Sequence, residues 1–129
     1  MKNIIINLTL ILVIAMSLML SGCSANYMIA ENTEDIEEDP RDDEAYRERA
    51  LAWEEKRDYD RAIADYTKAI EIDPANAEPY YFRALVWEDK GDYDRALADC
   101  STGLKLTDIS HLNEYFIETQ KRLKKKRSQ

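Results

Sequence analysis

Residues from which most enzymes and metal sites are built are scarce in this chain. Its 129 residues include three glycines, three prolines, two cysteines and one histidine. Three isolated glycines exclude a glycine-rich phosphate-binding loop and a nucleophile elbow, because both need several glycines within a short motif. Few turn-forming residues, together with 34% charged residues, argue against a turn-rich sheet fold. We expect one small all-α domain with short accessory segments.

The few residues capable of catalysis or metal binding are not grouped. His111 has no cysteine and no second histidine at ligand spacing, so a polar residue at the start of a helix explains it better than a metal ligand. Cys100 falls on an apolar stripe, which favours a buried, inert thiol over a reactive one. We therefore predict no catalytic residue, no metal, no cofactor and no enzymatic activity.

Positive charge is also in short supply. The chain holds 18 Lys and Arg against 26 Asp and Glu, a net charge of -8. Such a balance gives no broad attraction to nucleic acid phosphates. We expect a basic or mixed-charge protein or peptide partner and no nucleic acid.

A long hydrophobic run occurs only near the N-terminus. Lys2 precedes an apolar stretch from Ile4 to Leu20, which Ser21 and Gly22 follow. A cation, an apolar core and a small-residue cleavage site are typical of a secretory signal peptide, predicted here at residues 1–22. The alternative is a membrane-spanning anchor, although this run lies at the short edge of the roughly 17 to 25 residues that a span needs.

The segment Leu20-Ser21-Gly22-Cys23 resembles the lipobox of bacterial lipoproteins. The resemblance implies that Cys23 becomes the mature N-terminus and carries two or three acyl chains such as palmitate, enough for stable membrane anchoring. It also implies a bacterial cell-envelope location, and Ser24 favours the outer membrane in a Gram-negative cell. The alternative is a chance cysteine after an ordinary signal peptide.

The stretch after Cys23 is strongly acidic. Residues 24–44 hold nine acids against Arg41 alone, and hardly any apolar residue follows Ile36. Such a stretch cannot bury enough apolar surface to offset the entropy of ordering it. We predict that residues 23–42 form the lipidated N-terminus and a disordered tether.

An internal repeat dominates the rest of the chain. Most residues from Tyr46 to Asp65 recur 34 positions later, from Tyr80 to Asp99. Each copy predicts two helices, because its apolar residues recur at spacings of three and four. Alanines on these stripes alternate with tyrosines and tryptophans, an alternation of size that suits close packing of antiparallel helices.

The two copies, AYRERALAWEEKRDYDRAIADYTKAIEIDP and PYYFRALVWEDKGDYDRALADCSTGLKLTD, resemble successive tetratricopeptide repeats, whose length is 34 residues. The resemblance implies antiparallel helix hairpins stacked as a short right-handed solenoid, with repeats at residues 43–76 and 77–109. Residues 110–126 resemble the capping helix that closes many such arrays, and residues 127–129 form a tail. Because two repeats bury a small core, we expect further stabilisation from the last helix, from dimerisation or from a partner.

The turns and the differences between the copies give local predictions. Asp58 and Asp92 stand at N-cap positions before the second helix of each copy. Arg57 occupies the position where the second copy has a glycine, so it is predicted in a conformation that glycine adopts more cheaply. Cys100 and Gly103 replace a tyrosine and an alanine of the first copy, which predicts looser packing there.

One pair of opposite charges recurs at a fixed spacing. Arg49 and Asp65 are 16 residues apart, as are Arg83 and Asp99. We hypothesise that each arginine reaches the aspartate of its partner helix in a structural ion pair.

In the family that the repeats resemble, the outward side of each first helix lines a concave groove. Carried over to this sequence, the groove is formed by Glu44, Arg47, Leu51, Glu54, Glu55, Glu78, Tyr81, Leu85, Glu88 and Asp89. This face is acidic with an apolar centre, and it lacks the basic and amide side chains by which some members clamp a C-terminal carboxylate. A ligand with Lys or Arg around an apolar anchor would suit it. The alternative is a solvated face without a ligand.

The end of the chain is strongly basic, with six cations and no acid between Lys121 and Arg127. These cations can complement the dipole of the last helix, contact anionic lipid head groups, or dock into the acidic groove of a neighbouring copy. The sequence leaves the three uses open.

The repeats and the anchor together predict a non-catalytic protein-interaction module, a membrane-anchored adaptor or scaffold of the cell envelope. The alternative is a self-assembling homo-oligomer whose repeats stack in trans with no separate ligand.

Overall fold

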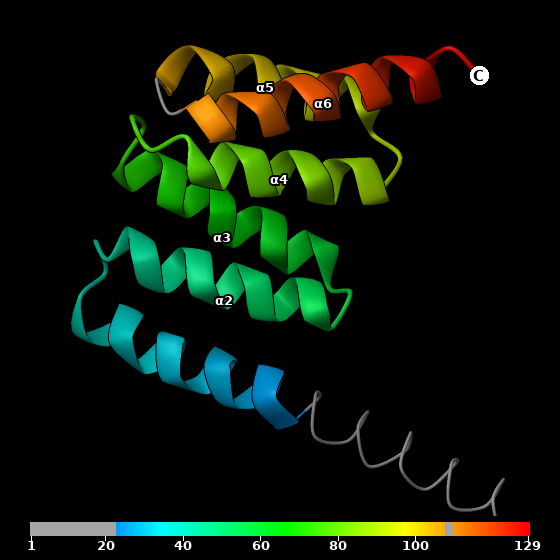
Figure 1. Ribbon diagram of the computed structural model, residues 1–129. Helices are drawn as coiled ribbons and strands as arrows, with labels where there is room; N and C mark the ends of the chain where they lie inside the picture. The colour runs from blue at the N-terminus through cyan, green and yellow to red at the C-terminus, as the bar shows by residue number, and fades with distance from the viewer. Residues whose placement is uncertain (1–22, 108–109) are drawn as a thin grey trace, which may run out of the picture.

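The computed structural model describes residues 23–107 and 110–129, so the predicted signal peptide lies outside the described residues. Helices make up this part of the chain, and it contains no strand. The helices are residues 23–38, α2 (Asp43–Glu55), α3 (Tyr59–Ile72), α4 (Glu78–Asp89), α5 (Tyr93–Leu106) and α6 (Ser110–Arg127) (Figure 1). None of the helices in these residues is both long and apolar enough to cross a membrane. The all-α prediction is confirmed.

Consecutive helices pack against each other in chain order. α2 pairs with α3 and α4 with α5 as antiparallel hairpins, while α3 meets α4 and α5 meets α6, so the hairpins stack into a short solenoid (Figure 1). The alanines predicted at the close contacts, Ala50, Ala62, Ala84 and Ala96, are fully buried. Their small side chains let the helices approach, because a larger side chain there would hold the backbones apart.

Local turn chemistry follows the sequence. The Asp58 carboxylate accepts a hydrogen bond from the Arg61 amide at 3.3 Å, and Asp92 accepts one from Arg95 at 3.1 Å, which confirms both predicted N-caps. Arg57 has φ of 58°, the left-handed conformation that glycine adopts in the second copy, as predicted. A side chain in this region is strained by about 1 to 2 kcal/mol, so the first turn is the more costly one.

The prediction of looser packing at Gly103 is wrong. The ring of Phe116, from α6, fills the space beside this glycine, and a Cβ on Gly103 would lie 2.2 Å from its Cζ. Both Phe116 and Cys100 are fully buried. The smaller residues of the second copy therefore make room for an aromatic side chain of the next helix.

The hypothesised arginine–aspartate pairs are confirmed. Arg49 donates from Nε and Nη2 to the two carboxylate oxygens of Asp65, both at 2.8 Å. Arg83 makes the same two-pronged contact with Asp99 at 2.8 and 2.7 Å. Both aspartates are buried, so the contacts are only weakly screened by solvent.

Each arginine also holds the helix on its other side. Arg49 donates through Nη1 to the hydroxyl of Thr33 at 3.1 Å, and Arg83 donates to Thr67 at 2.8 Å. Thr33 belongs to the helix of residues 23–38, here called the N-terminal helix, and Thr67 belongs to α3. One guanidinium therefore ties three consecutive helices together.

Removing one partner of such a pair is expected to be costly. Asp99→Ala leaves Arg83 without its carboxylate in a half-buried position, and we expect a loss of about 3 kcal/mol in the free energy of unfolding. The measurement is urea unfolding followed by circular dichroism. Replacing both residues, Arg83→Met with Asp99→Leu, removes the uncompensated charge. Equal destabilisation by the single and the double variant would contradict this account.

The prediction of a disordered tether is wrong for residues 23–38, which form a helix along α2. The acidic composition hides a stripe of inward-facing residues at spacings of four, three and four: Ala25 and Asn32 are buried, while Ile29 and Ile36 are half-buried. The acids of this helix, such as Glu31 and Glu34, are exposed and do not prevent its packing.

The contacts of this N-terminal helix copy those of α3. The Thr33 hydroxyl donates to the carbonyl of Ile29, as that of Thr67 does to Ile63. Lys56 contacts Asn26 across 30 residues, and Lys90 contacts Asp60 at the same spacing. The 34-residue period thus extends into residues 23–38, which hold the place of the second helix of a further repeat.

Candidate functional site

A pocket of about 390 Å³ opens on the face formed by α2, α4 and α6. Arg47 lines it from α2, and Glu78, Tyr81 and Phe82 line it from α4. From α6 come Leu112 and Tyr115. Side chains from three alternate helices of the stack therefore meet in this pocket.

Aromatic rings form the floor of this pocket. The ring of Tyr81 packs edge-on against Phe82 and Phe116, with centroids 5.5 and 5.4 Å apart, and lies 6.0 Å from Tyr115. Tyr115 is 52% exposed, so one aromatic ring remains open to a ligand. Rings fixed by their neighbours lose little conformational freedom when a partner binds them.

The rim of the pocket is acidic. Glu44 accepts hydrogen bonds from the guanidinium of Arg47, which raises the pKa of that arginine, although its partial burial opposes the shift. The Nε of Arg47 also lies 4.0 Å from Glu78. Both glutamates are exposed. Because the one cation is shared between two carboxylates, the rim keeps a net negative charge.

The remaining residues predicted for the α2 part of the groove lie farther along that helix. Leu51 is half-buried and packs against the core around Tyr66. Glu54 accepts a hydrogen bond from the hydroxyl of Tyr66. Burial raises the pKa of Glu54, while this hydrogen bond acts in the opposite direction. Glu55, at the end of α2, is exposed.

In α4 the predicted residues divide into buried and exposed ones. Tyr81 lines the pocket, whereas Leu85 is half-buried and Asp89 is exposed. Glu88 is buried, with 8% of its surface exposed. Its carboxylate accepts hydrogen bonds from Arg122 at 2.9 and 2.8 Å and from Lys126 at 2.8 Å. Glu88 is therefore occupied by α6, and the prediction that it contacts a ligand is wrong.

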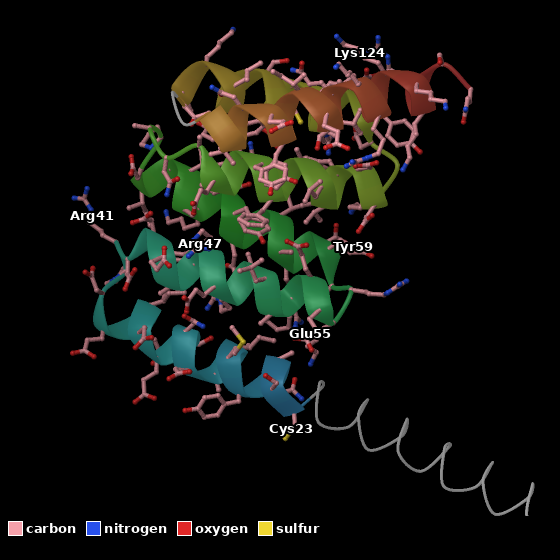
Figure 2. All side chains as sticks on the ribbon, in the orientation of Figure 1. Cys23, Arg41, Arg47, Glu55, Tyr59 and Lys124 are labelled. Carbon is pink, nitrogen blue, oxygen red and sulfur yellow. The ribbon has the colours of Figure 1, made fainter. Side chains whose placement is uncertain are left out.

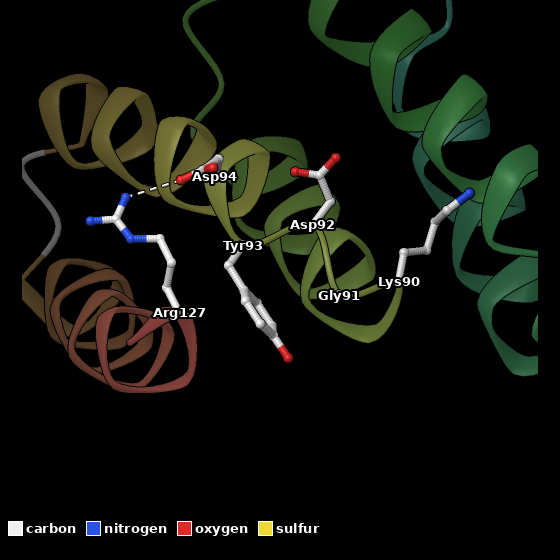
Figure 3. A pocket seen from close by; sticks show the side chains of 6 residues that line it. All are labelled: Lys90, Gly91, Asp92, Tyr93, Asp94 and Arg127. Atoms are coloured by element: carbon white, nitrogen blue, oxygen red, sulfur yellow. Dashed lines mark hydrogen bonds and ion pairs between the residues drawn. The ribbon is translucent and has the colours of Figure 1, made fainter. Parts of the chain in front are cut away.

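The basic end of the chain serves partly as an internal clamp. Besides the three hydrogen bonds to Glu88, Arg127 donates to Asp94 of α5 at 3.0 Å (Figure 3). Three of the six cations thus fasten α6 to the two preceding helices, a use in addition to the three that the sequence left open. The hollow between Arg127 and the α4–α5 turn is lined by Lys90, Gly91, Asp92, Tyr93, Asp94 and Arg127.

Attachment of α6 is expected to weaken in acid. Hydrogen bonds from Arg122 lower the pKa of Glu88, burial opposes them, and Lys126 adds to the lowering. Stability from this carboxylate is therefore fully present above its ordinary pKa of 4.5 and is lost as the pH falls through the lowered value.

We expect Glu88→Gln to speed hydrogen exchange of the α6 amides about 30-fold at neutral pH, because charge-assisted bonds worth about 2 kcal/mol are lost. The neighbouring Asp89→Asn, which changes charge at an exposed site, is the control. Hydrogen exchange read by mass spectrometry distinguishes them. Equal protection of α6 in both variants would show that the clamp adds nothing.

Sequence reasoning missed Phe82, Leu112 and Tyr115 as lining residues. A signal was present, because Tyr115 follows Tyr81 by 34 residues, and Tyr81 follows Arg47 by the same interval. The same step leads from Glu54 through Glu88 to Arg122. α6 thus holds the place of a first helix in a third unit.

Chemistry in the described residues is limited. They contain no cluster of His, Cys, Asp and Glu able to hold a metal ion. Burial raises the pKa of the Cys100 thiol to about 12, so the thiolate form that would react is not populated near neutral pH. The side chain of His111 lies outside the described residues.

Comparison with known proteins identifies the family. A tetratricopeptide repeat profile matches residues 55–91. The tetratricopeptide domain of Arabidopsis OM64 is 31% identical, with 81% of this chain and 84% of that domain covered and a TM-score of 0.73. This chain belongs to the tetratricopeptide repeat family. No curated protein sequence matches it.

Two more distant structures share the fold of this tetratricopeptide repeat protein. The second tetratricopeptide domain of human RPAP3, solved with the HSP70 peptide SGPTIEEVD, is 23% identical, covers 74% of this chain and 78% of its own length, and has a TM-score of 0.68. The type III secretion translocator chaperone SycD of Yersinia enterocolitica is 15% identical, with coverages of 88% and 83% and a TM-score of 0.75.

Proposed function

We propose that this protein is a non-catalytic adaptor that binds a segment of a partner protein in the pocket between α2, α4 and α6. The observation that carries the proposal is the open Tyr115 ring beside Tyr81, bordered by the carboxylates of Glu44 and Glu78. A fixed aromatic floor offers an apolar side chain a place to bury, and family membership supports a protein-interaction role.

The charge of the rim favours a basic ligand. RPAP3 was solved with a peptide that carries three acids, and an acidic segment of that kind would meet Glu44 and Glu78 here. Lys or Arg on either side of an apolar anchor would instead reach these carboxylates, and the charges would speed association. Arg47 does not reverse this preference, because Glu44 already holds it.

The proposal predicts a defined charge preference that fluorescence anisotropy can measure. The probes are two labelled nonapeptides that share a central leucine and phenylalanine, one flanked by lysines and the other by glutamates. We expect the full chain to bind the basic peptide and Tyr81→Ala to weaken it about tenfold or more, since truncating a central aromatic residue costs about 2 kcal/mol. Glu78→Gln should mainly slow association.

Glu71→Gln is the matched control, because Glu71 is an exposed acid of α3 outside the pocket whose one described partner is Lys68. It should bind the basic peptide as the unchanged chain does. If Glu71→Gln and Glu78→Gln weaken binding equally, the preference reflects net charge and the pocket proposal fails. Self-association in sedimentation equilibrium without binding of either peptide would favour stacking in trans, to which the exposed Tyr27 and Ile117 could contribute.

We further propose that the adaptor is a bacterial lipoprotein held on the cell-envelope membrane through Cys23. Cys23 is exposed in the first described turn of the N-terminal helix, so acyl chains on its sulfur would not disturb the packing of residues 23–38. The resemblance to a lipobox is the reason for proposing acyl chains on Cys23.

Mass spectrometry of the protein expressed in a bacterium tests this anchor. We expect the mature chain to begin at Cys23 with added diacylglyceryl mass and to float with membranes on a density gradient. Cys23→Ser should retain the uncleaved precursor mass, while Cys100→Ser should be processed normally. An unmodified chain beginning at residue 24 or later would contradict the lipid anchor but would leave the pocket proposal unaffected.

A further inference from the structure

Both the N-terminal helix and α6 place their chemically distinctive residues at one edge of the solenoid. Cys23, the first described residue of the N-terminal helix, lies at this edge, where α2 and α6 also end. In Figure 2 the labelled Cys23, Glu55, Tyr59 and Lys124 lie toward the same ends of the helices, and Arg41 lies at the opposite ends. We call the first the Cys23 edge and the second the Arg41 edge.

Side-chain contacts fasten neighbouring hairpins along the Cys23 edge. Lys56 reaches back to Asn26, and Lys90 reaches back to Asp60. Arg127 reaches Asp94 in the same way at 3.0 Å. The N-terminal helix and the end of α6 are therefore fixed parts of one surface, in contrast to the flexible tether that the sequence suggested.

A strongly basic segment lies at the Cys23 edge and a strongly acidic one at the Arg41 edge. Residues 121–127 hold six cations and no acid, whereas residues 35–44, at the Arg41 edge, hold seven acids and one cation. Three of the six cations are used in the clamp on Glu88 and Asp94. Lys121, Lys124 and Lys125 share another face of α6 at spacings of three and four, are exposed, and enter none of the described ion pairs.

The dipole of α6 does not account for all three lysines. Its effect is confined to the last turn of a helix, and Lys121 lies six residues before Arg127, outside that turn. A cluster of exposed cations attracts an anionic surface over about a Debye length, roughly 8 to 10 Å at ordinary salt. Long lysine side chains on two turns of helix can reach such a surface together.

We propose that the Cys23 edge is a lipid-facing surface, and that Lys121, Lys124 and Lys125 contact the head groups of an anionic membrane. The anchor at Cys23, which is part of the proposed function, brings this edge to the lipid. The lysines then fix its orientation, because the acidic Arg41 edge is repelled by the same surface. The repeat stack stands on the membrane with that edge directed away from it.

The test reads the distance of each edge from the lipid in the membrane-anchored full protein. A fluorophore is placed at Ser128→Cys, beside the lysines, or at Ala75→Cys, in the exposed α3–α4 turn on the Arg41 edge. The protein is reconstituted into phosphatidylcholine vesicles with or without phosphatidylglycerol, and quenching by head-group-labelled lipid is measured. Cys100 is buried and is not expected to take the label.

We expect strong quenching at position 128 and little at position 75 in vesicles that contain phosphatidylglycerol. The difference should disappear in pure phosphatidylcholine and at about 1 M salt, where the Debye length falls to roughly 3 Å. It should also disappear when Lys121, Lys124 and Lys125 are changed to glutamine. These three changes leave the clamp on Glu88 intact.

The matched control changes Arg41, Lys68 and Lys105 to glutamine, which removes the same charge from exposed sites away from the Cys23 edge. This variant should keep the quenching difference. Equal quenching at positions 75 and 128, or equal loss in both triple variants, overturns the proposal. The proposal is also overturned if the fluorophore at position 128 becomes protected from quenching as protein density rises, independently of lipid charge. That result would indicate contact between copies.

Failure of the lipid anchor gives a different result. Without acylation, mass spectrometry detects no lipid at Cys23, whereas the charge-dependent difference between positions 75 and 128 remains for whatever fraction binds the vesicles. The contribution of the lysines without the anchor can be measured in the full chain carrying Cys23→Ser. Changing the three lysines to glutamine in this chain should weaken its binding to anionic vesicles about a hundredfold, roughly fivefold for each lysine. Unchanged binding there would count against the lysines themselves.

Discussion

The stack depends on one arginine in each of the helices α2 and α4. Arg49 binds Asp65, 16 residues ahead, and Thr33, 16 residues behind, and Arg83 repeats both contacts with Asp99 and Thr67. A guanidinium has donors directed to both sides in one plane, so a single side chain can satisfy the helix before it and the helix after it. A lysine could not hold both neighbours with fixed geometry. Stacking is thus specified by a position that both copies of the repeat share.

Much of this architecture could be predicted because it repeats. Two copies of the same spacing indicated the hairpins, the buried alanines, the N-caps at Asp58 and Asp92 and the arginine–aspartate pairs. The N-terminal helix was missed because its identities with the copies are few and its acids dominate the composition. Thr33, Ile36 and Asp39-Pro40 nevertheless stand 34 residues before Thr67, Ile70 and Asp73-Pro74. Packing against α2 stabilises the helix of that segment, and composition alone does not reveal such packing.

The candidate site was only partly predictable for a related reason. The sequence placed Glu44, Arg47 and Tyr81 on one face, and the pocket contains or adjoins all three. The sequence also assigned Glu88 to this groove, because an acid that binds a ligand and an acid that binds the next helix occur at the same spacing. Only the position of Arg122 and Lys126 separates the two uses. The repeat identifies equivalent positions, but α6 changes the role of one of them, Glu88.

The clamp on Glu88 also divides the acidic face into two parts. Toward the Cys23 edge, Arg122 and Lys126 neutralise Glu88, whereas Glu44 and Glu78 remain exposed near the start of α2 and α4. The open aromatic ring of Tyr115, in the first half of α6, lies on the same part of this face as these glutamates. If the Cys23 edge lies on lipid as proposed, the pocket sits toward the far ends of the helices. A basic segment would then meet the pocket before it meets the cations at the end of α6, because those cations face the membrane.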